Sequence, residues 1–165
     1  MKRTVFTFVM MVALSLSVCG QNSNREILRA LADSDDVEKV SIGSVGMWFA
    51  KLAGGLNNVP GLKGINSIEI LTVSDKCPQK RKEAIKKQIA SLSDDSEYET
   101  LMMVKDEGDK VRMLIRQDDE IVKELLLVVV SDKKNDSDSV VIRIKGKLKL
   151  SEIQEMIEKG EIKIS

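Results

Sequence analysis

The chain has 165 residues, of which 26 are basic and 26 acidic, so its formal net charge is zero. It contains no histidine, which removes the usual general base and excludes Ser-His-Asp and Cys-His nucleophile systems and most zinc sites within this chain. A chain of this length can bury a sizeable core in one domain, and its balanced charge gives no general argument for nucleic-acid binding.

The N-terminal residues have the features of an export signal. Two basic residues precede an uncharged stretch over residues 4–18, which has the length of a signal-peptide apolar region and is too short to span a bilayer. Cleavage after Gly20 would give a mature chain that begins at Gln21. A lipobox-like sequence offers an alternative in which Cys19 is lipidated and becomes the N-terminus, although Val18 is larger than the small residue expected before it.

We therefore expect residues 1–20 to be a cleaved signal peptide and residues 21–165 to form a single globular domain in the periplasm, with a membrane-tethered lipoprotein as the alternative. Removing residues 1–20 leaves a net charge of −2. If cleavage follows Gly20, Cys77 is the one cysteine left, so no internal disulfide can form. Cys77 is expected to be a small buried hydrophobic residue, with an exposed reactive thiol as the alternative.

Two helices separated by a strand are predicted first. Ser23 and Glu26 have the spacing of a capping box, which predicts a helix over 24–33. A strand is expected over 37–42, and a second helix between Ser44 and a glycine pair. One buried face of this second helix is predicted to comprise Val45, Trp48, Phe49 and Leu52. Trp48 and Phe49 are expected to form the centre of the core, with a ligand platform as the alternative.

A central strand and a basic helix are predicted next. Residues 65–73 are rich in β-branched side chains and apolar on both faces, which predicts the strand. Pro78 then occupies the favoured first position of a helix expected over 78–92. The basic face of this helix is explained by contact with solvent, with docking to an anionic partner or a membrane surface as the alternative. Its predicted core stripe is Ile85, Ile89 and Leu92, and its basic residues are Lys80, Arg81, Lys82, Lys86 and Lys87.

The second half of the chain is predicted to form an antiparallel meander. Turn-forming residues separate four strand-length runs over 98–105, 110–116, 121–131 and 139–150. Six consecutive apolar residues over 125–130 predict a strand that is buried on both sides.

The chain is predicted to end with a helix. Ser151 and Gln154 have capping-box spacing, which predicts a helix up to Lys159, followed by a short edge strand over 161–165. The order of all these elements predicts an α+β fold. It should contain a single antiparallel, partly mixed sheet of about five to six strands, with helices packed mainly on one face.

The clearest candidate for a functional surface comes from two strands that alternate apolar and basic residues. Period-two alternation places the cations of each strand on one face, opposite its apolar residues. If the two rows share a face, the open side of the sheet is a basic surface suited to phosphate, uronate or a lipid headgroup. The alternative is a solvated face that resists aggregation. The residues of this expected anion-binding face are Lys110, Arg112, Arg116, Arg143, Lys145, Lys147 and Lys149.

The sequence contains no recognisable catalytic, cofactor-binding or metal-binding motif. It has no G-x-S-x-G, Walker or G-x-G-x-x-G pattern. Its acidic clusters at 94–95 and 118–120 are typical of capped turns and do not follow the EF-hand spacing. We therefore expect no cofactor, no metal and no enzyme activity.

The leading hypothesis is a non-enzymatic binding or adaptor module of the cell envelope. Its expected partner is an envelope protein or an anionic envelope component. No nucleic acid is expected as a partner, and membrane contact is expected only through a lipid on Cys19. A small envelope hydrolase that uses carboxylates or a Ser-Lys pair is the alternative.

Several segments together resemble a family of exported proteins. They are the signal peptide before Gln21, Ser41 to Leu52 with its Trp-Phe pair, Ile65 to Leu71, Val111 to Val130 with Lys123-Glu124-Leu125 at its centre, and Ile144 to Leu148. These segments are similar to proteins of Bacteroides-type bacteria grouped as domain of unknown function 4252. The resemblance covers residues 24–160 and rests on hydrophobic patterns. It implies an envelope location in a Gram-negative cell and transfers no catalytic or binding residue.

Overall fold

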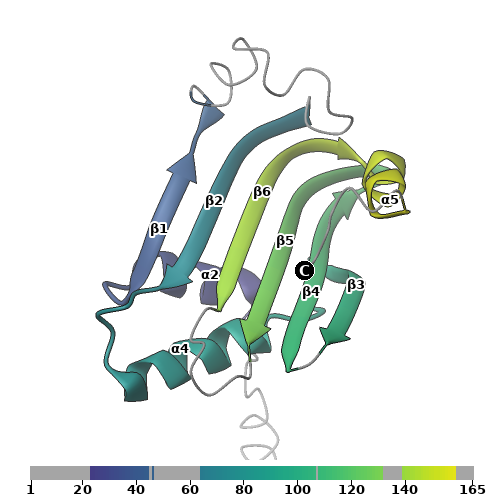
Figure 1. The fold of residues 1–165 in the computed structure, drawn as a ribbon. Coiled ribbons are helices and arrows are strands. Elements are labelled where there is room, and N and C mark those ends of the chain that lie inside the picture. The colour runs from purple at the N-terminus through teal and green to yellow at the C-terminus, as the bar shows by residue number, and fades with distance from the viewer. Residues whose placement is uncertain (1–22, 45, 47–63, 107, 132–138, 159–165) are drawn as a thin grey trace, which may run out of the picture.

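The computed structural model describes residues 23–44, 46, 64–106, 108–131 and 139–158 (Figure 1). The helices and strands in chain order are α2 (Asn24–Ala32), β1 (Val37–Ile42), β2 (Ile65–Val73), α4 (Gln79–Ser91), β3 (Glu99–Asp106), β4 (Asp109–Asp118), β5 (Ile121–Ser131), β6 (Val140–Lys149) and α5 (Leu150–Glu158).

Most of the predicted elements are confirmed. The structure gives β1, β2 and β5 the predicted bounds, and the ends of the other predicted elements that it describes move by one or two residues. The helix predicted to begin at Ser44, with its proposed core centre, and the edge strand predicted over 161–165 lie outside the described residues.

The strands form one six-stranded sheet in the order β1-β2-β6-β5-β4-β3, in which every neighbouring pair is antiparallel. The predicted α+β class is therefore confirmed, and the described sheet is antiparallel throughout. The predicted meander is also confirmed, since β3, β4, β5 and β6 are neighbours both in sequence and in the sheet. The pairing of β2 with β6 joins this meander to the N-terminal half of the chain.

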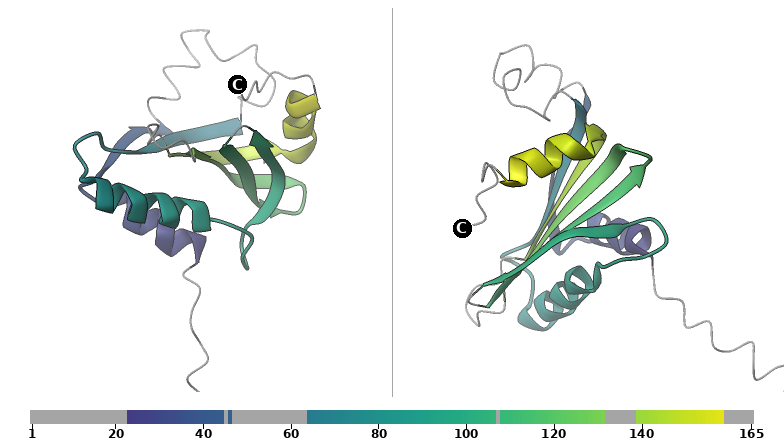
Figure 2. Two further views of the ribbon diagram at one scale, coloured as in Figure 1. Left: turned by 60° about the horizontal axis from the view of Figure 1, so that its bottom comes forward. Right: turned by 90° about the vertical axis from the view of Figure 1, so that its right-hand side faces the viewer.

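Two helices cover one face of the sheet, which we call the helix side (Figure 2). The predicted capping box at the start of α2 is present, with Ser23 and Glu26 each accepting a hydrogen bond from the other's backbone N–H. Both helices bury an apolar stripe against the sheet. The core of the helix side includes Leu28, Leu31, Leu71, Ile85, Ile89, Leu92, Leu114, Leu126, Val128 and Val141.

Among the described residues, the opposite face, which we call the open side, is covered by a helix at one end, where α5 lies (Figure 2). Ile153 of α5 is 1% exposed and packs in a second apolar cluster with Val122 and Leu148. The capping box predicted at Ser151 is wrong, because α5 begins one residue earlier. Its start is fixed differently, since the backbone N–H of Leu150 donates to the carbonyl of Glu120 at 3.2 Å.

Strands β2 and β6 approach each other closely at two glycines. A Cβ atom on Gly146 would collide with the backbone carbonyl of Gly64, and one on Gly64 would collide with the carbonyl of Lys147. The register between the two strands also shifts here, between Ile65 and Ser67. Only residues without a side chain allow this approach, which explains why glycine stands at both positions.

Cys77 belongs to the core of the helix side, where it is 5% exposed. Burial and the nearby carboxylate of Asp36 raise the pKa of its thiol. A higher pKa lowers the fraction of thiolate at neutral pH, and the thiolate is the reactive form. The expectation that Cys77 is a small buried hydrophobic residue is therefore confirmed.

Candidate functional site

The two predicted basic rows do share a face, but that face is the helix side. Arg143 pairs across the strands with Leu126, which in turn pairs with Leu114. Both leucines are 0% exposed and pack against the helices. The expectation of an open basic side is therefore wrong. Val141 and Arg143 lie on the helix side, and the alternating residues Ile142 and Ile144 lie on the open side.

The arginines of these rows are engaged inside the protein. Arg112 donates from Nη1 to the carbonyl of Leu92 at the end of α4. Arg116 and Arg143 both bind Glu124, whose side chain is 1% exposed. Arg116 Nη2 lies 3.1 Å from Glu124 Oε2, and Arg143 Nε donates to the other carboxylate oxygen. Paired in this way, one carboxylate offsets the burial of two guanidinium groups.

We call Glu124, Arg116, Arg143, Tyr98 and Glu69 the Glu124 cluster. Arg143 Nη1 also lies 3.5 Å from Glu69 Oε2. Burial alone would raise the pKa of Glu124, but its bonds to Arg143 and Arg116 outweigh burial, and the pKa is lowered. Burial and the charge of Glu124 raise the pKa of Tyr98 to about 12. The cluster thus holds an ionised carboxylate and a neutral tyrosine at neutral pH.

The lysines of the predicted face do not converge on one surface. Lys145, Lys147 and Lys149 are exposed in β6. Lys110 pairs with Val130, whereas Lys149 pairs with Ile121 at the other end of β5. The seven predicted residues therefore do not form one surface. Two arginines bind the buried Glu124, the third binds the end of α4, and the lysines lie at opposite ends of the sheet. Anion binding by the exposed lysines stays a prediction.

The open side carries three consecutive rows of side chains across β2, β6, β5 and β4. The register places eleven apolar residues and one threonine at these twelve positions. Antiparallel sheets commonly bury one face and solvate the other, so a second face without charge marks a surface that another layer can cover. The rows are Thr72–Val140–Val129–Val111, Ile70–Ile142–Leu127–Met113 and Ile68–Ile144–Leu125–Ile115.

Burial of these rows decreases away from α5 and towards β1. Met113 and Ile115 are 1% and 2% exposed, whereas Ile70 and Ile142 are only partly buried. On the neighbouring edge strand, Val40 is 58% exposed and extends the middle row of the open side. Large contiguous apolar patches are uncommon on the surface of soluble monomeric proteins.

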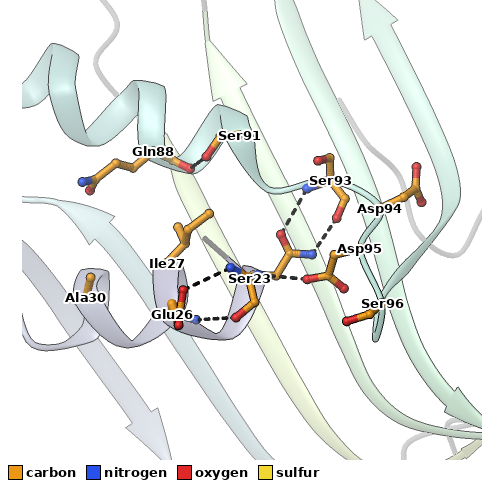
Figure 3. A pocket seen from close by; sticks show the side chains of 11 residues that line it. Ser23, Glu26, Ile27, Ala30, Gln88, Ser91, Ser93, Asp94, Asp95 and Ser96 are labelled. Atoms are coloured by element: carbon orange, nitrogen blue, oxygen red, sulfur yellow. Dashed lines mark hydrogen bonds between the residues drawn. The ribbon is translucent and has the colours of Figure 1, made fainter. Parts of the chain in front are cut away.

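A polar pocket of about 480 Å³ lies between the start of α2 and the chain that follows α4 (Figure 3). The side chain of Asn24 donates to the carbonyl of Ser93 at 2.6 Å and accepts from its N–H at 3.3 Å. Asp95 accepts the backbone N–H of Asn24 at 2.9 Å. These polar groups therefore tie the two segments together.

The acidic turn at 94–95 caps backbone groups, as predicted. Asp95 accepts the N–H groups of Glu97 and Tyr98, both at 2.8 Å, and Asp94 accepts that of Thr100. Burial alone would raise the pKa of Asp95, but these donors and the N–H of Asn24 lower it. No group of three or more Cys, Asp or Glu side chains is arranged to hold a metal within the described residues.

The described residues thus form an α+β fold with one antiparallel sheet whose open side carries three apolar rows. The chain belongs to the family described as Domain of unknown function (DUF4252), whose model matches residues 31–156. The resemblance noted from the sequence is thereby confirmed. No curated protein and no solved structure matches the chain. No helix in the described part of the chain is long and apolar enough to cross a membrane.

Sequence reasoning missed the Glu124 cluster and the open side. A signal for the first was present, since Glu124 is a lone carboxylate beside the six-residue apolar run of β5. A signal for the second was the apolar character of both faces of β2. Neither signal identifies which strand positions lie side by side, because that depends on the register of the sheet.

Proposed function

We propose that this protein is an exported, non-enzymatic binding module of the cell envelope, and that its open side takes up an apolar surface of another protein. The observation that carries the proposal is the set of three charge-free rows across four strands. Covering such a surface removes apolar area from water, which stabilises a complex by roughly 25 cal/mol per Å² before the costs of association.

Export is supported by the uncharged stretch over residues 4–18 after two basic residues. A mature chain that begins at Gln21 would be free in the periplasm, and one that begins at a lipidated Cys19 would be tethered to a membrane. Both locations leave the open side accessible to an envelope protein.

The alternative of a small hydrolase has weaker support. Glu124 is held by two arginines, and Asp95 of the polar pocket accepts three backbone N–H groups. A general base needs a carboxylate with free acceptor capacity near its substrate, and these two carboxylates are engaged already. We therefore favour binding over catalysis.

The proposed function is tested with Nile red, an uncharged dye that fluoresces on apolar surfaces. The mature chain should increase its emission, and the variants Ile142→Lys and Leu127→Lys should lose most of that increase. Met103→Lys is the matched control, because Met103 is 51% exposed but lies on the helix side. Emission that is absent with the parent, or lost equally in the control, would overturn the proposal. Circular dichroism checks that each variant is folded.

A further inference from the structure

The two faces of the sheet differ in where their positively charged residues lie. The paired strand positions that face the open side contain no lysine or arginine among the described residues. The helix side carries Lys39, Lys105, Lys110, Arg112, Arg116, Arg143, Lys145 and Lys149 at its paired positions. At the paired positions of the described strands, positive charge therefore lies on the helix side alone.

The charged residues that do face the open side are acidic, and they lie at its rim. Glu38 pairs with Thr72 on the β1 edge, and Glu99 pairs with Ile115 on the β3 edge. Asp109 precedes Val111 by two positions in β4 and therefore faces the same way. We call these three residues the acidic rim.

Two members of the acidic rim are bonded to neutral groups. Ser74 Oγ donates to Glu38 Oε1 at 2.9 Å, and Gln117 Nε2 donates to Glu99 Oε1 at 2.6 Å. A hydroxyl or an amide orients a carboxylate without cancelling its charge. The neighbouring rows are apolar, so a partner bound over them excludes water. The electric field of these carboxylates is then stronger than in water.

We infer that the open side binds a protein segment whose apolar residues are flanked by lysine or arginine. The inference rests on the proposed function and specifies the partner's chemistry. Cationic flanks would meet the acidic rim while the apolar residues cover the three rows, which is complementary in both respects. An acidic segment or the anionic surface of a membrane would instead place like charges together.

The test uses two labelled peptides with the same apolar residues, one flanked by lysines and the other by glutamates. Fluorescence anisotropy with the mature chain should show about tenfold tighter binding of the lysine peptide, a preference that shrinks as salt is added. The triple variant Glu38→Gln, Glu99→Gln, Asp109→Asn should lose this preference. The control removes the same charge through Asp33→Asn at the end of α2, Glu83→Gln in α4 and Glu97→Gln, whose carboxylate pairs with Arg25 of α2. It should retain the preference.

Equal affinity for both peptides would overturn the inference and leave the proposed function standing. So would stable binding to vesicles that contain anionic phospholipid. Failure of both peptides to bind a chain that still binds Nile red also overturns the inference. A further outcome is that the peptides bind only after Trp48, Phe49 and Leu52 are replaced by serine. Such a result would identify the chain's own segment that contains these residues as the occupant of the open side. That last result would overturn both the inference and the proposed function.

Discussion

The helix side and the open side are made by alternate residues of the same six strands, yet they differ in charge and in covering. Residues one position apart therefore have different environments. Leu126 lies beneath the helices at 0% exposure, whereas Leu127 is only partly buried. The comparison shows that apolar character alone does not make a core, because a face becomes a core when another layer covers it.

The difference in charge has the same origin. Arginine can be placed on the helix side because Glu124 lies there to pair with it, 1% exposed and bonded to two guanidinium groups. On the open side, no strand position carries a cation in the paired residues described, so Glu38 and Glu99 of the acidic rim face no cation across the strands.

The largest difference between the two faces should appear when neighbouring leucines of β5 are truncated. Leu126→Ala leaves a cavity beneath the helices and should lower the free energy of unfolding by about 4 kcal/mol. Leu127→Ala should cost about 1–2 kcal/mol, because its site is already partly open to water. Urea unfolding of both variants measures this difference. Equal losses would mean that the two faces are equally covered in solution.

Replacing Glu124 should have the next largest effect. Glu124→Gln leaves Arg116 and Arg143 without their shared carboxylate and should lower the free energy of unfolding by about 3 kcal/mol. The exposed Glu83→Gln is a matched control and should change it by less than about 0.5 kcal/mol. Chemical denaturation compares the two. A loss in Glu124→Gln as small as that of the control would show that the buried cluster does not organise the helix side.

The pH titration of Tyr98 should refine the comparison, and its effect on the free energy of unfolding at neutral pH is the smallest of the three. This is the one tyrosine in the chain, so tyrosinate absorbance reports on it alone. Its pKa is raised to about 12, so its contribution to stability is complete below the ordinary pKa of about 10 and is lost as pH rises through 12. In Glu124→Gln the midpoint should fall towards 10. A parent midpoint near 10 would contradict the burial of this group.

The same cluster sets a second pH dependence with the opposite sign. The pKa of Glu124 is lowered, so its contribution is complete above the ordinary carboxyl pKa and is lost as pH falls through its lower folded value. The stability difference between the parent and Glu124→Gln should therefore shrink in acid.

Local features of the fold could be predicted from the sequence. The capping box of Ser23 and Glu26 sets the start of α2 through contacts three residues apart, so it can be read directly. The bounds of β1, β2 and β5 follow from β-branched runs between turn residues. The start of α5 could not be read in this way, because it depends on a contact between Leu150 and Glu120 across the fold.

The candidate site was harder to predict, because it depends on which face the helices cover. Strand β6 has apolar residues in both of its alternating sets, with Val141 in one and Ile142 in the other. Alternation alone therefore cannot decide which set is buried. The partners of Glu124 are 8 and 19 residues away in sequence and belong to different strands, so their meeting is set by register.

The β2–β6 pairing has a consequence for the order in which the fold assembles. Strands β3 to β6 can pair with sequence neighbours, but β2 meets β6 through residues such as Glu69 and Arg143, which are 74 positions apart. Closing so long a loop is entropically costly, so non-local pairings form slowly. Synthesis begins at the N-terminus, and β2 therefore cannot complete its pairing until the last strand has been made. The paired strands β1 and β2 should join late and open first in native-state hydrogen exchange.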